Sequence, residues 1–236
     1  MPVHRIRAIT LDLDDTLWEI GPVIRRAEAE LWEWLSGHYP RIPQRVSQDQ
    51  LVEIRAGLAA EHPARSHDFR FLRKLALARV ALMAGYSTDL VEPAFEVFDA
   101  ARNRVEFFPD VLPVLEVLAS RYRLIALTNG NASLQRIGVS HFFHDVVTAV
   151  EAGAAKPARP IFEEAVRRSG VNREQILHVG DHPENDVEGA RSAGFRSAWM
   201  NRNGNLWPQE LNLPDAIVTN MSELHDLLLA ARVADR

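Results

Sequence analysis

Short apolar runs rich in β-branched residues recur along this chain of 236 residues, and segments with helical periodicity separate them. The first run, over 6–13, contains β-branched residues and has no helical period, which predicts a buried strand. The further strands and helices predicted in this way are strands at 124–127, 146–150 and 176–179, weaker ones at 197–200 and 216–218, and helices at 111–121, 159–169 and 186–193. Alternation of strands and helices predicts an α/β fold with a parallel sheet covered on both faces.

Residues 18–107 interrupt this alternation, because they contain almost no strand signal. Apolar residues recur there at helical spacing instead, in two sets: Ile24, Ala27, Leu31 and Leu35, and then Leu72, Leu75, Leu77, Val80 and Leu82. Gly85 is expected to end the second helix. We therefore predict a helical domain over 18–107, inserted after the first strand, and a core domain formed by 1–17 and 108–236.

Composition excludes several classes of function. The formal net charge of −5 leaves no basic footprint for nucleic acid. The chain has no cysteine, which excludes disulfides, thiolate nucleophiles and cysteine zinc sites. No apolar run reaches the length of about 18 residues that spans a bilayer, and the first residues do not read as a signal peptide. We expect a cytoplasmic protein with neither a nucleic-acid nor a membrane partner.

Two carboxylates stand where the first strand is predicted to end, in the segment Asp12-Leu13-Asp14-Asp15-Thr16. Carboxyl ends of parallel strands face the ligand crevice of such a sheet. Asp12 and Asp14 share one side of an extended segment and repel each other, unless a cation joins them or one keeps its proton. Mg²⁺ suits an oxygen-rich site of this kind. An acidic turn without function explains the five residues alone equally well.

A second acidic pair follows the strand predicted at 176–179. Asp181 stands at its end, and Asp186 is expected at the start of the next helix. Capping and the helix dipole would explain one such aspartate, but a second one five residues away is harder to dismiss. Gly180 allows a tight turn. His178, inside the strand, is predicted to be a core residue.

Two further segments suit an anion. Thr128-Asn129-Gly130 follows the strand at 124–127, and backbone N–H groups at the start of a helix, expected at Asn131 or Ala132, bind anions. The alternative is an ordinary capped loop. Lys156, in a Lys-Pro step before the helix at 159–169, reads by itself as a solvated surface charge.

Together these four motifs, in this order, resemble the haloacid dehalogenase-like superfamily, and specifically its phosphatases with a helical cap on a Rossmann-like core. The resemblance implies that Asp12 is the nucleophile and that Asp14 is the general acid and base. It implies that Thr128, Asn129 and Lys156 bind the phosphoryl group. It further implies a Mg²⁺ site made by Asp12, the backbone carbonyl of Asp14, Asp181 and Asp186, with Asp186 acting through water or by orienting the site.

The substrate implied is a small phosphorylated metabolite. Leu-Asp-Leu-Asp-Asp-Thr-Leu, Thr-Asn-Gly-Asn-Ala, Leu-His-Val-Gly-Asp and the segment from His67-Asp68 to Arg73 are similar to the flavin-nucleotide and pyrimidine-phosphate phosphatases of riboflavin metabolism. FMN or its ribityl-pyrimidine precursor is the leading candidate. The predicted helical domain is expected to form a cap over the crevice, with hinges near 18–21 and 107–109. Trp18 at the first hinge and Arg73 in the cap are predicted substrate contacts. The alternatives are that Trp18 packs the hinge and that Arg73 is a surface charge.

Other activities share parts of this pattern. A sugar-phosphate phosphatase or a phosphomutase would use the same Asp12 and Asp14, and only product analysis separates a mutase from a phosphatase. A dehalogenase needs no acid two residues after its nucleophile, so Asp14 argues against it. A non-catalytic binding module would be expected to have lost at least one of Asp12, Asp14, Lys156 and Asp181. The oligomeric state is not readable from the sequence.

Overall fold

The computed structural model describes residues 6–233, so residues 1–5 and 234–236 of the predicted core domain lie outside the described part. Six parallel strands form one sheet, in the order β3-β2-β1-β4-β5-β6. They are β1 (Ala8–Leu11), β2 (Arg123–Thr128), β3 (Asp145–Thr148), β4 (Ile176–Gly180), β5 (Arg196–Met200) and β6 (Ala216–Val218). The predicted α/β class with a parallel sheet is confirmed, and each strand coincides with a predicted apolar run.

Burial explains why β1 is largely apolar. It pairs with β2 on one side and β4 on the other, and all four of its residues are buried. The third strand ends earlier than predicted, at Thr148, because the next residues form the short helix α8 (Ala149–Ala152). The Thr148 side chain accepts a hydrogen bond from Glu151 N, and the Glu151 side chain accepts one from Thr148 N, which caps this helix.

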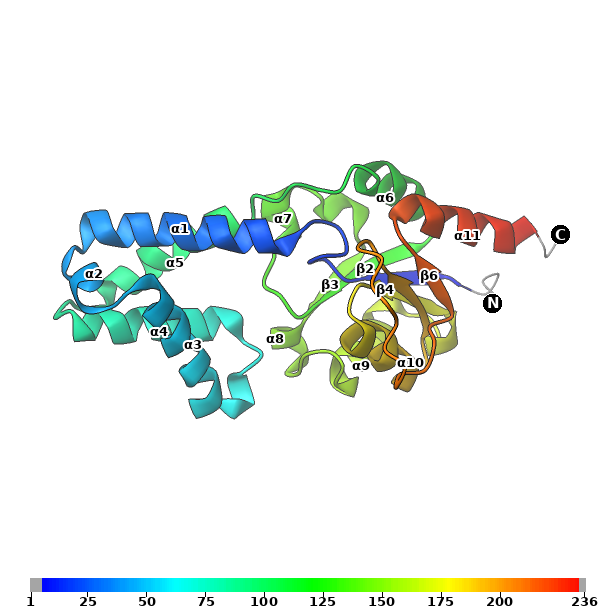
Figure 1. Ribbon diagram of the computed structural model, residues 1–236. Helices are drawn as coiled ribbons and strands as arrows, with labels where there is room; N and C mark the ends of the chain where they lie inside the picture. Colours follow the sequence, from blue (N-terminus) through cyan, green and yellow to red (C-terminus); the bar gives the residue numbers. More distant parts are fainter. Residues whose placement is uncertain (1–5, 234–236) are drawn as a thin grey trace. The chain divides into compact units, whose positions relative to one another are not determined.

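Helices cover both faces of the sheet. α6 (Val111–Ala119) and α11 (Met221–Val233) lie on one face, whereas α9 (Arg159–Ser169) and α10 (Gly189–Ser192) lie on the other (Figure 1). Phe162 of α9 packs in a buried cluster with residues of β2, β3 and β4. Shorter turns complete this part of the chain: η4 (Ser140–Phe142), η5 (Arg173–Gln175) and the π-helical turn η6 (Pro183–Glu188).

The strand order reverses between β1 and β4. From β1 the chain proceeds outward through β2 to β3, and it then returns to β4 and proceeds outward on the other side through β5 to β6. In open parallel sheets the crevice at the carboxyl ends of the strands on either side of this reversal is where ligands bind. The residues that follow Leu11 and Val179 therefore occupy the position that this topology favours for a functional site.

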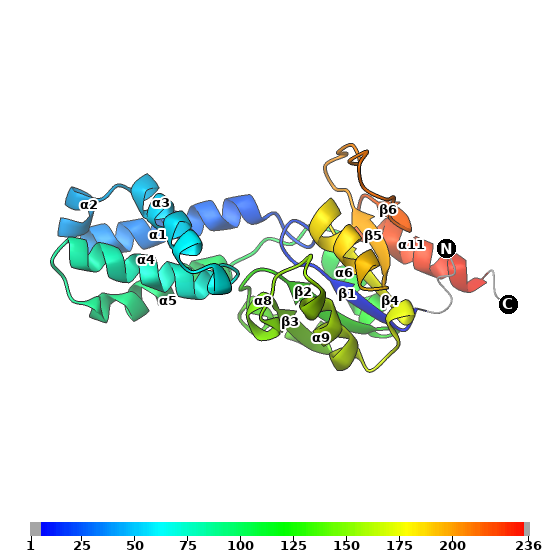
Figure 2. The same cartoon turned by 90° about the horizontal axis from the view of Figure 1, so that it is seen from below.

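The segment between β1 and α6 is helical, as predicted. Its elements are α1 (Ile20–His38), α2 (Arg41–Arg45), α3 (Gln48–Glu61), η2 (Pro63–Arg65), α4 (Phe69–Met83), η3 (Thr88–Leu90) and α5 (Val91–Arg102). α1 packs along α5, and α3 along α4 (Figure 2). Apolar residues of these helices form a core of their own, and Gly85, with φ of 70°, follows the end of α4. Among the described residues, no helix is long and apolar enough to cross a membrane.

By compactness the chain divides into two units. One contains the described residues up to Glu19, Glu106–Gly130 and the described residues from Gly138 onward, and the other contains Ile20–Val105 and Asn131–Ile137. The boundaries after residue 17 and before residue 108 stay a proposal. The second unit, called the helical unit below, thus includes a short segment that follows the loop after β2, and the chain passes between the units four times.

Two contacts explain why this short segment groups with the helical unit. Ser133 N donates to Asn103 Oδ1 at 2.7 Å, and Arg136 forms an ion pair with Asp99 at 2.9 Å. The helix expected to start at Asn131 or Ala132 begins later, as α7 (Leu134–Ile137). The Ser133 hydroxyl accepts a hydrogen bond from Arg136 N at 3.3 Å, which is the usual contact of a residue that precedes a helix.

Candidate active site

Asp12 follows β1 directly and continues its pairing with β4. Its backbone N–H donates to Val179 O at 2.9 Å, and its side chain is buried. The chain then turns sharply, with Asp15 in the left-handed region at φ of 60° and Asp15 N donating to Trp18 O at 2.8 Å. The strand therefore holds the Asp12 carboxylate at the carboxyl edge of the sheet, and the turn brings Trp18 back to the segment that carries Asp14.

Lys156 is the centre of the site. Its ammonium donates to Asp12 Oδ1 at 2.5 Å, to Asp186 Oδ1 at 2.6 Å and to the backbone oxygen of Leu127 at 2.8 Å. Because an ammonium has three N–H groups, each has an acceptor. The residue is buried, with 4% of its surface exposed. Lys156 is therefore a fixed part of the site, in contrast to the surface charge that its loop position suggests.

Three carboxylates gather around this lysine. One oxygen from each of Asp12, Asp181 and Asp186 lies within 4.8 Å of the others. Asp181 Oδ1 also accepts a hydrogen bond from Thr16 Oγ1 at 3.3 Å. If all three carboxylates are ionised, they and the Lys156 ammonium together carry a net charge of −2. Burying such an excess is costly unless a cation compensates for it.

The pKa values of two of these groups reflect this excess. Burial raises the pKa of Asp12 well above its usual range. The positive charge of Lys156 opposes this shift, whereas the negative charges of Asp186 and Asp181 add to it. Burial also raises the pKa of Asp181 to about 7, with added repulsion from Asp186 and Asp15. Both carboxylates are thus hard to ionise in the protein alone, which is the behaviour expected of groups that a divalent cation would stabilise.

Asp186 and Lys156 behave differently, because each has strong partners. Burial disfavours ionisation of Asp186, but Lys156 and His178 outweigh it and hold its pKa below the usual range. Burial would lower the pKa of Lys156, but Asp12 and Asp186 outweigh it and raise the pKa above the usual value. Asp186 and Lys156 are therefore a charged pair at neutral pH.

The donor set suits Mg²⁺. Carboxylate oxygens are the ligands that this ion prefers, and its two positive charges match the excess on the cluster. Asp186 differs from the other two in that both its oxygens already accept hydrogen bonds: Oδ1 from Lys156 and Oδ2 from His182 N at 2.9 Å. It lies inside the π-helical turn that begins at Pro183, and not at the start of a helix as predicted.

Sequence reasoning missed the part that His178 has in this site. The imidazole is buried, as predicted, but its Nε2 lies 3.1 Å from Asp186 Oδ1 and its Nδ1 lies 2.8 Å from Thr10 Oγ1. Burial lowers the pKa of His178, although Asp186 opposes this. The signal that could have found it is the presence of a histidine within an otherwise apolar strand.

Thr128 and Asn129 stand at the end of β2, on the other side of β1. Thr128 Oγ1 accepts a hydrogen bond from Gly130 N at 2.9 Å. The Asn129 side chain makes two bonds to the Lys156 backbone, since its Oδ1 accepts from Lys156 N at 2.7 Å and its Nδ2 donates to Lys156 O at 3.1 Å. Asn129 thus joins the loop after β2 to the loop that presents the lysine.

Asp14 and Trp18 form a pair in the turn that follows Asp12. Trp18 Nε1 donates to Asp14 Oδ1 at 2.9 Å, and the indole is buried with an edge-to-face contact to Phe107. The hinge-packing alternative for Trp18 therefore has direct contacts in its favour, whereas its role as a substrate contact stays a prediction. The indole fixes the orientation of the Asp14 carboxylate.

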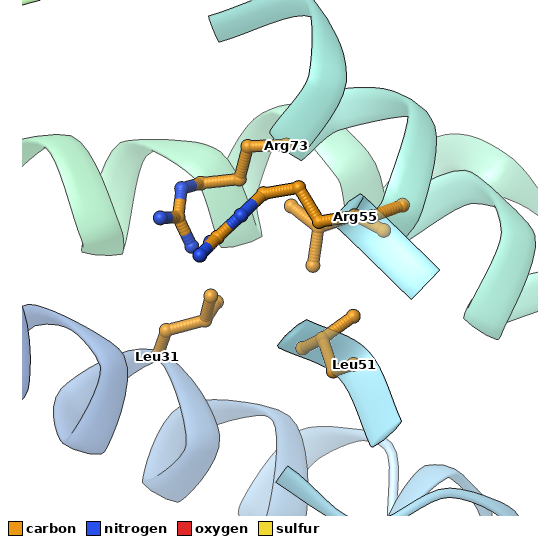
Figure 3. Close-up of a pocket in the computed structure, with 6 residues that line it drawn as sticks. Leu31, Leu51, Arg55 and Arg73 are labelled. Atoms are coloured by element: carbon orange, nitrogen blue, oxygen red, sulfur yellow. The ribbon is translucent and has the colours of Figure 1, made fainter. Parts of the chain in front are cut away.

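Arg73 lies in α4 and belongs to the helical unit, whereas the site residues described above belong to the other unit. Its guanidinium donates to both oxygens of Glu28, at 2.9 and 3.0 Å, and Glu28 also accepts from Arg55 at 2.8 Å. Figure 3 shows the Arg73 and Arg55 side chains next to each other in a small pocket lined by Leu31 and Leu51. Arg73 is thus a buried, paired charge in this structure, and its contact with substrate stays a prediction.

Comparison with known proteins is consistent with this geometry. Over 235 residues the chain is 31% identical to the 5-amino-6-(5-phospho-D-ribitylamino)uracil phosphatase YigB of Escherichia coli (strain K12), covering 96% of this chain and 98% of that protein. It is 30% identical to the glyceraldehyde 3-phosphate phosphatase of Methanopyrus kandleri, covering 94% and 97%. Among solved structures, a 2-haloacid dehalogenase from Pseudomonas syringae pv. Tomato DC3000 superimposes with a TM-score of 0.89 and 41% identity, over 95% of this chain and 98% of that one.

The family model for haloacid dehalogenase-like hydrolases matches residues 6–194, which span the sheet from β1 to β4 and the helical unit. All four sequence motifs lie inside this range. On this match, and on its similarity to full-length relatives, the protein is a hydrolase that belongs to the haloacid dehalogenase-like family.

Proposed function

We propose that this enzyme is a Mg²⁺-dependent phosphatase that cleaves small phosphomonoesters through an aspartyl-phosphate on Asp12. The observation that carries the proposal is the buried contact of Lys156 with both Asp12 and Asp186, beside Asp181. This contact orients the Asp12 carboxylate, and it supports the proposal because the ammonium supplies positive charge beside the proposed nucleophile. Two full-length relatives are named phosphatases, which supports the same chemistry.

The proposed reaction has two steps. In the first, an Asp12 carboxylate oxygen attacks phosphorus, the bond from phosphorus to the ester oxygen breaks, and Asp14 in its acid form gives the departing oxygen a proton. In the second, Asp14 takes a proton from water, the water oxygen attacks phosphorus, and the bond to Asp12 breaks to release inorganic phosphate. The hydrogen bond from Trp18 holds Asp14 in orientation for both transfers.

Asp12, the Asp14 backbone carbonyl and Asp181 are the proposed ligands of Mg²⁺. Asp186 is proposed to orient the site, because both its oxygens already accept hydrogen bonds from the protein. The bound ion would offset repulsion between the carboxylates and the phosphoryl group. Lys156 and the Thr128 hydroxyl, with the Asn129 backbone, are proposed to bind the phosphoryl oxygens. A phosphoryl oxygen would have to share an N–H of Lys156, since each one already has an acceptor.

The test is phosphate release by the wild-type enzyme and by Asp12→Asn with magnesium present. The asparagine amide keeps the size of the side chain but cannot form the acyl phosphate, so turnover should fall to background while circular dichroism is unchanged. Asp226→Asn is the matched control, because that carboxylate is 81% exposed and lies outside the site. Substantial turnover by folded Asp12→Asn would disprove the mechanism.

Dehalogenation is a second candidate, because the structure with a TM-score of 0.89 is that of a 2-haloacid dehalogenase. There Asp12 would attack carbon and displace a halide, which leaves without a proton. An ester oxygen does need one, so an acid beside Asp12 favours phosphate transfer. Halide release from 2-chloropropanoate, measured beside phosphate release, separates the two candidates. Halide release without any phosphate release would replace the phosphatase proposal.

Within the phosphatase proposal, FMN or its ribityl-pyrimidine precursor is the leading substrate class, supported by the similarity to YigB. The similarity to a glyceraldehyde 3-phosphate phosphatase supports small sugar phosphates as the alternative. Steady-state kcat/KM over a panel of both classes decides between them. Product analysis also decides between hydrolysis and mutase activity, because a mutase would return the phosphoryl group to a second hydroxyl instead of to water.

A further inference from the structure

A buried chain of hydrogen bonds continues from the proposed site into the sheet. It proceeds from Lys156 through Asp186 to His178, and from there to Thr10. Thr10 of β1 and His178 of β4 are direct partners in the register of the two strands, so their side chains lie on the same face of the sheet. Each of the four residues is at least 96% buried. The proposed mechanism makes no use of His178 or Thr10.

The partners of the ring determine the direction of these bonds. A carboxylate only accepts, so the ring nitrogen that faces Asp186 must carry the hydrogen, and Nε2–H is the donor. In the neutral ring Nδ1 is then an acceptor, and the Thr10 hydroxyl is its donor. Donation from Nε2–H to Asp186 holds in either charge state of the ring.

Asp186 Oδ1 is the point at which this chain meets the site. It accepts both from His178 and from Lys156, while Oδ2 accepts from His182 N. The carboxylate is therefore held at both oxygens, against the backbone of Gly180. Lys156 in turn donates to Asp12. A rotation of the Asp186 carboxylate would thus change the position of the ammonium that orients Asp12.

We propose that His178 is a positioning residue, which acts through Asp186 to hold Lys156 in register with Asp12, and that Thr10 selects the ring tautomer that does so. The consequence for catalysis rests on the proposed role of Asp12. The hydrogen bonds themselves do not rest on it. The His178 and Phe162 rings also pack in a T-shaped arrangement, with ring centroids 5.6 Å apart, so the imidazole has an aromatic packing contact as well as directional contacts at both nitrogens.

Three substitutions of His178 separate positioning from packing. The amide nitrogen of His178→Gln can reach the place of Nε2 and donate to Asp186, whereas that of His178→Asn is too short and replaces only Nδ1. His178→Leu fills the space without donating. Outer partners of such sites typically contribute roughly 10- to 100-fold to activity or metal affinity, so we expect kcat of the Asn and Leu variants to fall by that factor. We expect kcat of His178→Gln to fall by less than this factor, and KM to change little in all three variants.

Two readouts do not depend on turnover. Calorimetric titration of Mg²⁺ into the metal-free variants should show weaker binding for Asn and Leu than for Gln. In ¹⁵N-labelled wild-type protein, the His178 ring should give an Nε2–H resonance that exchanges slowly with solvent. Thr10→Val, which keeps the shape but loses the hydroxyl, should shift the ring ¹⁵N signals and lower kcat less than His178→Leu.

Equal losses in the Gln and Asn variants would show that donation from the Nε2 position is not what matters, and wild-type kinetics in folded His178→Leu would exclude positioning altogether. An Nδ1–H tautomer in the wild type would contradict the assigned direction of the bonds. Failure of the proposed function gives a different result, because an enzyme that is inactive on every phosphomonoester would still show the Nε2–H resonance of His178 and its shift in Thr10→Val.

Discussion

The Asp186 carboxylate packs directly against the backbone of Gly180, because a Cβ added to Gly180 would lie 2.2 Å from Asp186 Cγ. Only the absence of a side chain at 180 allows the carboxylate to reach Lys156 and the His182 N–H together. Glycine is required at this position because two groups approach closely. Backbone conformation does not require it, since the φ of Gly180 does not lie in the left-handed region.

Gly180→Ala should therefore displace Asp186 and lower kcat by roughly 10- to 100-fold, the range seen when outer contacts of such sites are lost. The matched control is Gly57→Ala on the exposed face of α3, where an added Cβ meets nothing within 4 Å. That change should leave activity intact and stabilise the protein by up to about 1 kcal/mol. Steady-state kinetics and thermal unfolding of both variants check this, and equal activity of the two would contradict the account of Asp186.

Removal of metal should abolish activity. We expect turnover to disappear with EDTA and to return with Mg²⁺, while Ca²⁺ supports little of it, because Mg²⁺ demands compact octahedral geometry and Ca²⁺ favours more ligands at longer distances. Phosphate release is measured after exhaustive chelation and dialysis, and circular dichroism checks that the metal-free protein stays folded. Activity that does not respond to chelation would rule out the metal roles of Asp12 and Asp181.

The raised pKa of Asp181 makes the stability of the metal-free protein depend on pH. The folded protein holds this proton up to about pH 7, against a usual value of 3.8, so the folded state binds more protons than the unfolded state between these two values. Stability should therefore fall as pH rises through this window. Urea unfolding at several pH values should show a shallower fall for Asp181→Asn. Saturating Mg²⁺ should reduce the fall in the wild type, and a pH-independent difference between the two proteins would contradict the assignment.

The hydrogen bond from Trp18 to Asp14 predicts a dependence on the leaving group. Trp18→Phe keeps an aromatic ring near Phe107 but loses the Nε1 donor, so the Asp14 carboxyl should lose its orientation. Cleavage of alkyl phosphates, whose leaving oxygen needs a proton, should slow more than cleavage of p-nitrophenyl phosphate, whose leaving oxygen needs little help. Asp14→Asn should show the same selectivity more strongly. Equal slowing of both substrates by Trp18→Phe would mean that the indole only packs the hinge.

The Glu28 cluster offers a test of Arg73. Burial lowers the pKa of Arg73 to about 10 even though Glu28 opposes the shift, so this guanidinium depends on its carboxylate partner. Breaking a buried ion pair typically costs about 3–5 kcal/mol, so Glu28→Gln should lower the free energy of unfolding by an amount approaching this. Arg73→Met should also destabilise the protein. A structural role leaves its KM unchanged, whereas a substrate contact would raise KM, and kinetics with urea unfolding distinguish the two.

Much of the fold and the site follows from local features of the sequence. Largely apolar runs such as Ala8–Leu11 indicate buried strands, because a strand covered on both faces favours apolar side chains. Positions at strand ends then place Asp12 and Asp181 at one edge of the sheet, since parallel strands present their carboxyl ends together. The division into a helical segment and a sheet likewise follows from a change of hydrophobic period within the chain.

The tertiary structure alone decided which side chains meet. Lys156 and Asp12 are 144 residues apart, and Thr10 and His178 are 168 apart, so no local period relates them. Sequence position suggested a surface charge at Lys156 and a core residue without a part in the site at His178, because burial of a polar group is stable only once distant partners satisfy it. Arg73 shows the same dependence, since its carboxylate lies 45 residues away on another helix. The sequence by itself determined which strands form and which carboxylates stand at their ends. The packing of strands and helices decided how those carboxylates are charged, held and paired, because hydrogen bonds between distant residues exist only when the whole chain has folded.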